Sequence, residues 1–282
     1  MTMPYEDPIL PVSSSKQPEF APEQKRLFRH VLELLNRSGI PYVVSGAFAL
    51  HTHTGIWRDT KDLDLFFTVP NAERALQLLD QGGFICEIRD PVWLAKAHQD
   101  DFFVDLITGM SNGAVMVDET WIERGRPEVV LGVSTRVLAA EELIASKIFV
   151  TRRERFDGAD IAHVVYGTRG QLDWDRLRSL AGDHWEVLLW NLLLFRYCYP
   201  AHTDFIPREV WRDLVGRLQH EIEHPQRTAE FRGSLIDDKM FAIDVDEWGL
   251  PDVEKRYRDA RHPRLGQGEP PKPVSQTEEN AA

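Results

Sequence analysis

Two aspartates interrupt an apolar segment near the start of the chain. Residues 58–67 read RDTKDLDLFF, in which Asp62 and Asp64 alternate with Leu63 and Leu65. On a β-strand, side chains at positions i and i+2 point to the same face, about 6–7 Å apart. Two carboxylates so close repel each other, and a divalent cation removes that conflict. Because magnesium is held by one or two carboxylates together with phosphates and waters, the pair predicts a metal–nucleotide site.

The Asp-x-Asp string alone is weak evidence, because 45 of the 282 residues are acidic. The string recurs at residues 173–175, where Asp173 is expected to cap a helix. It recurs again at residues 244–246, in a polar segment that we expect to be a solvated turn or loop. The alternative interpretation of Asp62 and Asp64 is an acidic pair solvated at the end of an edge strand.

Three nearby features favour a metal–nucleotide site at Asp62 and Asp64. Gly46 ends a strand-like run and opens a helix, so a phosphate could approach the backbone and the helix N-terminus there. Asp105 lies in a second apolar strand, DFFVDLITG, and would complete a three-carboxylate cluster if the two strands were neighbours. Arg58, Thr60 and Lys61 immediately precede the aspartate pair, so cationic groups flank the expected phosphate position.

The elements that must position these residues alternate over residues 22–138, which predicts an α/β (α+β) domain with a mixed sheet. Apolar residues recur at helical spacing in the first helix, and Gly39 follows it as a stop signal. The expected elements are a helix at 22–39, a strand at 42–46, a helix from 47, a strand at 62–69, a helix at 71–83 with Asn71 as N-cap, and strands at 84–89, 101–108 and 128–138.

Residues 139–262 are expected to form a mostly helical C-terminal domain. The expected helices lie at 139–155, 158–167, 173–182, 184–199 and 207–224. Residues 1–21 and 263–282 are polar and rich in proline, and they are expected to be a flexible N-terminal segment and a disordered tail.

Composition excludes several classes of protein. The net charge of −12 argues against a global cationic surface for nucleic acid, and the two cysteines give no disulfide framework or zinc spacing. The longest apolar run, residues 187–195, is too short to span a bilayer, and the start of the chain does not resemble a signal peptide. We therefore expect a soluble, cytoplasmic protein without a membrane partner. The HEIEH run at 220–224 formally matches a zinc-peptidase motif, but Pro225 follows it directly, and the chain has no P-loop.

The ordered motifs resemble the nucleotidyltransferase fold of the DNA polymerase β superfamily. They are a strand-Gly-Ala-helix unit at 42–51, Arg-x-Thr-x-Asp-h-Asp at 58–64 and h-Asp-h at 104–106, where h is apolar. The likeness is nearest to small bacterial nucleotidyltransferases of the abortive-infection-toxin and antibiotic-modifying types. Related proteins often carry a lysine followed by Arg-x-Asp-x-x-Asp, which matches Lys147 and the run from Arg155 to Asp160.

The resemblance implies transfer of a nucleoside monophosphate from a nucleoside triphosphate (NTP) to a hydroxyl acceptor, with release of pyrophosphate. Asp62, Asp64 and Asp105 would be catalytic and would bind two Mg²⁺ ions, with Mn²⁺ as an alternative metal. Asp105 would lie nearer the acceptor and help to deprotonate its hydroxyl. Asp157 and Asp160 are expected to cap and orient the next helix, and a role in the site is the alternative for both. The implied nucleotide-binding residues are Ser45, Gly46, Ala47, Arg58, Thr60, Lys61, Lys147 and Arg155.

Two alternatives remain open at this point. The superfamily commonly has Gly-Ser or Gly-Gly where this chain has Gly46 and Ala47, which motivates a catalytically inactive nucleotide-binding or regulatory protein, for example in a toxin–antitoxin or defence system. A sugar-nucleotide glycosyltransferase could also use Asp62 and Asp64, but the region before this motif is short for that class. The acceptor could be a small molecule, a protein or RNA; nucleic acid is not favoured by the charge, although residues 152–155 could form a basic patch. The oligomeric state is left open.

Overall fold

A mixed seven-stranded sheet forms the centre of the protein in the computed structural model, which describes residues 19–58 and 60–267. The strand order is β3-β4-β5-β2-β1-β7-β6, with β2 and β5 parallel and β4 and β5 antiparallel. The expectation of a mixed sheet in an α/β arrangement is therefore confirmed. The strands are β1 (Val43–Val44), β2 (Asp62–Phe66), β3 (Ile85–Asp90), β4 (Leu94–Gln99), β5 (Phe102–Ile107), β6 (Arg126–Val130) and β7 (Val133–Val137).

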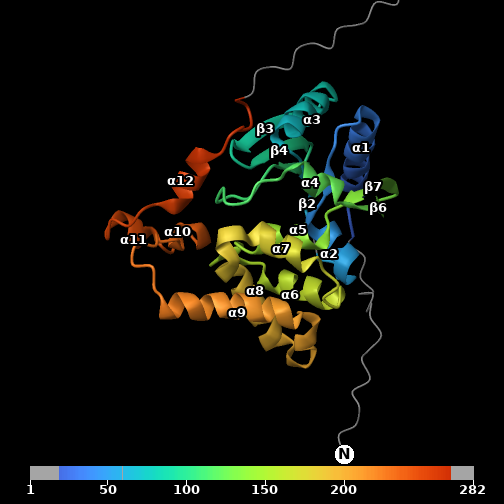
Figure 1. The fold of residues 1–282 in the computed structure, drawn as a ribbon. Coiled ribbons are helices and arrows are strands. Elements are labelled where there is room, and N and C mark those ends of the chain that lie inside the picture. Colours follow the sequence, from blue (N-terminus) through green and yellow to red (C-terminus); the bar gives the residue numbers. More distant parts are fainter. Residues whose placement is uncertain (1–18, 59, 268–282) are drawn as a thin grey trace, which may run out of the picture.

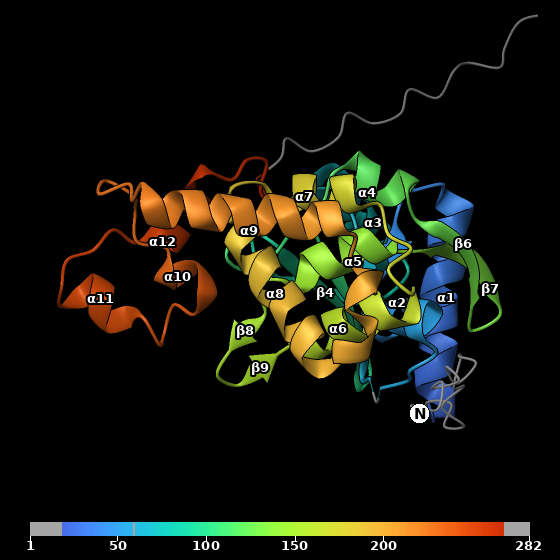
Figure 2. The same cartoon turned by 60° about the horizontal axis from the view of Figure 1, so that its bottom comes forward.

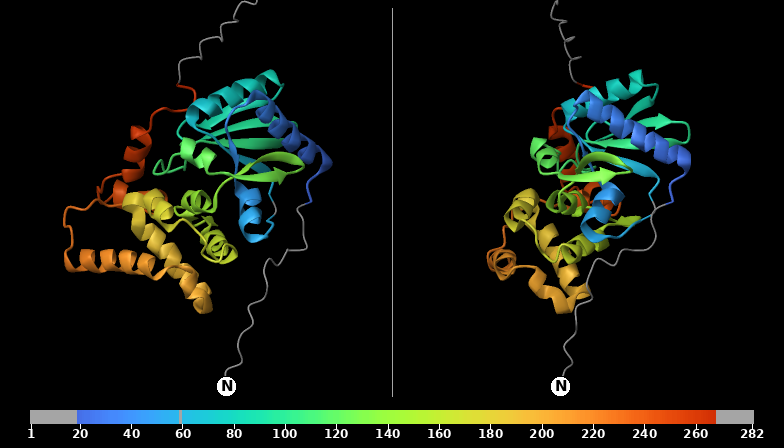
Figure 3. Two further views of the ribbon diagram at one scale, coloured as in Figure 1. Left: turned by 45° about the vertical axis from the view of Figure 1, so that its right-hand side comes forward. Right: turned by 90° about the vertical axis from the view of Figure 1, so that its right-hand side faces the viewer.

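Two helices cover one face of this sheet (Figures 1 and 3). They are α1 (Pro22–Ser38) and α3 (Val69–Gln81), and the apolar stripe of α1 is buried. The strand residues that point to this face are fully buried: Leu63 and Leu65 of β2, and Val104 and Leu106 of β5. Because successive strand residues alternate between faces, Asp62, Asp64 and Asp105 must point to the opposite face.

The helices of the C-terminal half lie beyond that opposite face (Figures 1 and 2). Within the described residues, no helix is long and apolar enough to cross a membrane. The remaining helices are α2 (Gly46–Thr54), α4 (Glu119–Glu123), α5 (Ala140–Lys147), α6 (Gly158–Gly167), α7 (Trp174–Ala181), α8 (Trp185–Cys198), α9 (Arg208–Glu223), α10 (Gly233–Ile236), α11 (Ala242–Asp246) and α12 (Val253–Ala260). The predicted flexible ends fall mainly on residues 1–18 and 268–282, which lie outside the described residues.

Two predicted elements were wrong, and one strand was not predicted. Helix α3 begins at Val69 with Thr68 as N-cap, not after Asn71, because Pro70 has no N–H to leave unpaired in the first turn. The helix predicted at 139–155 ends at Lys147, and a hairpin of β8 (Thr151–Arg152) and β9 (Arg155–Phe156) follows. Strand β4 was not predicted at all.

Helix α5 is attached to its surroundings through a carboxylate with no solvent exposure. Glu142 Oε1 accepts from Arg176 Nε of α7 at 2.9 Å and lies 3.1 Å from Arg124 Nε at the end of α4. A buried carboxylate is costly unless cations and hydrogen bonds compensate it. These contacts therefore fix the helix whose last residue is Lys147.

Replacement of Glu142 by alanine should lower the free energy of unfolding by about 2–3 kcal/mol, because two arginines lose their shared partner and a buried site loses its packing. Urea denaturation followed by circular dichroism measures the change. The exposed Glu221 of α9 supplies the control, since Glu221→Ala should change stability by less than about 0.5 kcal/mol. Equal effects of the two substitutions would contradict this role for Glu142.

Candidate active site

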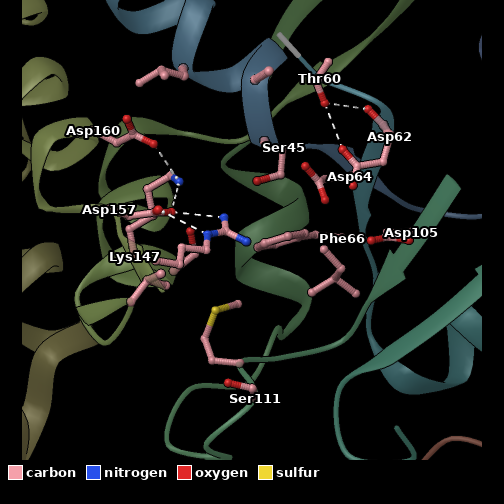
Figure 4. Close-up of a pocket in the computed structure, with 18 of the residues that line it drawn as sticks. Ser45, Thr60, Asp62, Asp64, Phe66, Asp105, Ser111, Lys147, Asp157 and Asp160 are labelled. Atoms are coloured by element: carbon pink, nitrogen blue, oxygen red, sulfur yellow. Dashed lines mark hydrogen bonds and ion pairs between the residues drawn. The ribbon is translucent and has the colours of Figure 1, made fainter. Parts of the chain in front are cut away.

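Three carboxylates meet at one point on the face of the sheet that is turned toward the helical half. Asp64 of β2 and Asp105 of β5 stand side by side in the parallel register, and Asp62 lies two residues before Asp64. One oxygen from each of the three groups lies within 4.8 Å of the others. In Figure 4 the three side chains lie on one side of a cavity. The structure thus brings together the residues that the sequence placed on two separate strands.

The backbone at Gly46 makes room for this cluster. Gly46 has a φ of +57°, and a Cβ added there would lie 1.8 Å from Asp64 Oδ2. The Ser45 amide donates to the Asp64 carbonyl oxygen at 2.9 Å, which ties the end of β1 to β2. Helix α2 starts at Gly46 without a side-chain cap, so its first amide groups remain available to an anion. A glycine is therefore required here by close approach as well as by conformation.

All the site residues expected from the sequence line a single cavity of about 750 Å³. Thr60 orients Asp62, since its hydroxyl donates to Asp62 Oδ1 at 2.8 Å. Lys61 also lines the cavity, and its carbonyl oxygen accepts from Gln24 Nε2 at 3.2 Å. Cationic and hydroxyl groups therefore line the cavity together with the three carboxylates.

The positive charge near the three carboxylates does not balance their negative charge. Burial, together with the neighbouring Asp62 and Asp105, raises the pKa of Asp64 to about 7, although Lys147 and Arg155 oppose this increase. Burial also raises the pKa of Asp105. Three carboxylates that offer only oxygen atoms are the ligands of hard cations such as Mg²⁺ and Mn²⁺. The residues present therefore fit a divalent metal.

Lys96 is a site residue that sequence reasoning missed. Its Nζ atom donates to Asp105 Oδ1 at 2.6 Å and lies 3.9 Å from the centre of the Phe103 ring. Strand β4 pairs with β5 so that Lys96 stands directly beside Asp105. The alternation of Ala95 and Ala97 with polar residues could have revealed this strand, because small buried residues at every second position predict a half-buried strand. The ammonium group leaves the second oxygen of Asp105 available.

A second group of charges lies across the cavity, on the side of the helical half (Figure 4). Lys147 Nζ lies 2.5 Å from Asp157 Oδ2 and 2.9 Å from Asp160 Oδ2. Arg155 donates twice to Asp157, and Arg58 forms an ion pair with Asp160. Burial opposes ionisation of Asp157, but Lys147 and Arg155 outweigh it and hold the pKa of Asp157 below the ordinary value.

This network changes the interpretation of its members. Asp157 occupies the N-cap position of α6, but its carboxylate makes no capping hydrogen bond and binds the cations instead. The expected capping role of Asp157 was therefore wrong. Lys147 and Arg155 line the cavity with their charges already paired, and nucleotide binding by them stays a prediction.

The other two Asp-x-Asp pairs, and the histidines of α2, do not line the cavity. Asp173 caps α7 as expected, accepting from the Arg176 amide at 2.9 Å. The pair at 244–246 lies in the short helix α11 rather than in a turn or loop. His53 is buried against the Leu138 carbonyl oxygen, and His51 stacks on Trp57.

A protein-family model described as "nucleotidyl transferase of unknown function (DUF2204)" matches residues 24–184. No curated protein matches the chain in the corresponding search. The family match crosses the predicted boundary between residues 138 and 139, and the division of the chain into domains stays a prediction.

Several solved structures are similar to this chain, including the following three. The antibiotic-resistance factor ANT(2'')-Ia in solution has 15% identity and a TM-score of 0.41, over 72% of this chain and 98% of that chain. The lincomycin-bound lincosamide antibiotic adenylyltransferase LnuA has 16% identity and a TM-score of 0.37, over 50% and 95%. An antigenic nucleotidyltransferase-like protein from Paracoccidioides brasiliensis has 17% identity and a TM-score of 0.40, over 67% and 96%. Identity and TM-score are low in each case, so the family assignment rests on the family model.

Replacement of Asp64 by asparagine should stabilise the metal-free protein at pH 8, because it removes a buried charge from a cluster of like charges. Because the pKa of Asp64 is raised in the folded state, the folded protein binds more protons than the unfolded protein between about pH 4 and 7. The free energy of unfolding of the original protein therefore falls as the pH rises through this range. The gain at pH 8 should be at most about 4 kcal/mol and should vanish near pH 4. Thermal unfolding with a chelator at both pH values measures it, and an equal gain at both would contradict the explanation.

Replacement of Lys96 by methionine should strengthen Mn²⁺ binding roughly 3- to 10-fold at pH 8, because a cation beside the metal ligands is removed. Isothermal titration calorimetry gives the affinity. Lys96→Arg keeps the charge and should bind Mn²⁺ like the original protein. Weaker binding by Lys96→Met would instead mean that the ammonium group serves mainly to hold Asp105 in place.

Proposed function

The chain belongs to the nucleotidyl transferase family whose model matches residues 24–184, and from this premise we propose that it transfers a nucleoside monophosphate from an NTP to a hydroxyl acceptor, releasing pyrophosphate. The observation that carries the proposal is the meeting of Asp62, Asp64 and Asp105 beside the open N-terminus of α2. We place the reaction in the cytoplasm, where NTPs and Mg²⁺ are both present.

Each part of the site has a role in this reaction. The first amides of α2 and the side chain of Lys61 bind the leaving phosphates, since a helix N-terminus and a cation both favour anions. Asp62, Asp64 and Asp105 would hold Mg²⁺, which supplies charge stabilisation at the reacting phosphoryl group. The oxygen of Asp105 that does not bind Lys96 takes the proton from the acceptor hydroxyl. Thr60 keeps the Asp62 carboxylate in a fixed orientation.

The ion-paired residues on the helical side of the cavity give that side a fixed distribution of charge. Arg155 is exposed and keeps donor groups that can turn toward a phosphate, whereas Lys147 is buried. We therefore assign Lys147 to positioning Asp157 and Asp160 rather than to direct phosphate contact. This arrangement keeps the cationic side of the cavity fixed before any nucleotide binds, which lowers the cost of reorganisation.

Incubation of the protein with each α-³²P-labelled NTP and Mg²⁺, with small molecules, proteins and RNA as separate acceptor pools, should label one pool. Asp62→Asn and Asp64→Asn should reduce labelling roughly 100-fold or more, because they remove metal ligands, and a chelator should abolish it. Asp246→Asn is the matched control, since it changes an Asp-x-Asp pair outside the cavity.

Nucleotide binding that requires Mg²⁺ without labelling of any pool would contradict the transfer reaction. That result would favour the inactive nucleotide-binding alternative, for which the Gly46-Ala47 pair is the motivation.

A further inference from the structure

The floor of the cavity changes from acidic to apolar within one step along the strands. Phe66 follows Asp64 by two residues on β2, and Ile107 follows Asp105 by two residues on β5. The register pairs Phe66 with Ile107, so these side chains form the next row on the same face, about 6–7 Å from the carboxylates. Both line the cavity. A molecule that presents a hydroxyl to Asp105 and extends along the strands therefore rests on an apolar floor.

Large apolar side chains also form the walls of this end. Trp93 comes from the turn between β3 and β4, Met110 follows β5, and Phe149 follows α5. Their positions are fixed by local contacts: the Thr108 amide donates to the Trp93 carbonyl oxygen at 2.8 Å, and the Phe149 ring packs edge-on against His184. In Figure 4, Phe66 lies between the aspartates and the loop that carries Ser111. The apolar end is thus part of a preformed cavity.

Charge also limits what this end can bind. Besides the three clustered aspartates, the carboxylates that line the cavity within the described residues are Asp157 and Asp160, and both are already paired with cations. Outside the proposed metal-binding cluster, a polycationic acceptor would therefore find no unpaired carboxylate among the described lining residues to bind its ammonium groups. Arg152, which also lines the cavity, is paired with Asp238 at 3.2 Å, which gives no advantage to a polyanion such as RNA.

From the floor, the walls and the paired charges, we infer that the acceptor is a small alcohol with an uncharged, apolar body, such as an aromatic or aliphatic ring beside the reacting hydroxyl. This inference rests on the proposed nucleotidyl transfer and assigns its substrate class. Burial of apolar surface supplies the affinity, at about 25 cal/mol per Å². The reacting hydroxyl of the acceptor then lies beside Asp105. It is one row along the strands from Phe66 and Ile107, which contact the apolar body of the acceptor.

A matched pair of probes tests the apolar contact. The protein is loaded with Mg²⁺ and the α,β-methylene analogue of the NTP that binds best, and calorimetry measures binding of 4-nitrophenyl β-D-glucoside, methyl β-D-glucoside and tobramycin. The two glucosides differ only in the apolar group. The aromatic glucoside should bind at least 10-fold more tightly than the methyl glucoside, and tobramycin should bind no more tightly than the methyl glucoside.

The Met110→Glu variant places a carboxylate in the apolar wall. It should reduce the preference for the aromatic glucoside several-fold and improve binding of tobramycin, whereas Met110→Leu should keep the original order. The affinity of each variant for the NTP analogue, measured in parallel, establishes that the cavity is still formed.

Equal affinity for the two glucosides, including no binding of either, would overturn the inference, as would tighter binding of tobramycin than of the aromatic glucoside. Failure of the proposed function is a separate result. It would show as absence of labelled product in the transfer assay while the preference for the aromatic glucoside persists.

Discussion

The approach of three like charges to within 4.8 Å of one another, on a partly buried surface of the sheet, is the constraint on which the rest of the structure depends. The repulsion between Asp62, Asp64 and Asp105 opposes folding, so the sheet must hold them by other means. The opposite face of the same strands supplies these means, because Leu63, Leu65 and their neighbours on β5 are fully buried beneath α1 and α3. A slip of one residue in the register would move the leucines to the cavity and the aspartates into the core. The apolar core and the acidic site therefore specify the same register.

Positive charge is placed around this cluster at two different distances. Lys96 touches Asp105 directly, while Lys147 and Arg155 act across the cavity and lower the pKa of Asp64 through space. Asp157 forms ion pairs with both Lys147 and Arg155, and these ion pairs hold the two cations away from the clustered aspartates. The result is a region of negative charge that is partly but not fully compensated, which is what a bound cation requires. The ion pairs thus serve the charge balance of the site more than the stability of the fold.

Local signals in the sequence predicted much of this arrangement, and long-range pairing explains most of what they missed. Asp62, Asp64 and Gly46 stand in patterns with a direct physical meaning, and Asp105 could be added because it breaks an apolar strand in the same way. Lys96 escaped notice because its strand is rich in alanine, and its importance comes only from its position beside Asp105. The sequence predicts helix for the hairpin after Lys147, because the charged run at 152–155 has no strand periodicity and the two strands are only two residues long. The ion pairs of Asp157 depend on where that hairpin turns, so helix-capping rules could not reveal them.

The two ends of the cavity are held by different parts of the chain. The metal end depends on strand register and on Gly46, all within residues 24–184 of the family match. The loop at the apolar end is braced from outside that match: Asn112 donates to the Leu235 carbonyl oxygen at 3.0 Å, and Arg261 donates to the Ala114 carbonyl oxygen at 2.9 Å. Arg258 of α12 contacts the Ser111 carbonyl oxygen in the same loop. Changes in the C-terminal segment can therefore reshape the apolar end without disturbing the carboxylate row.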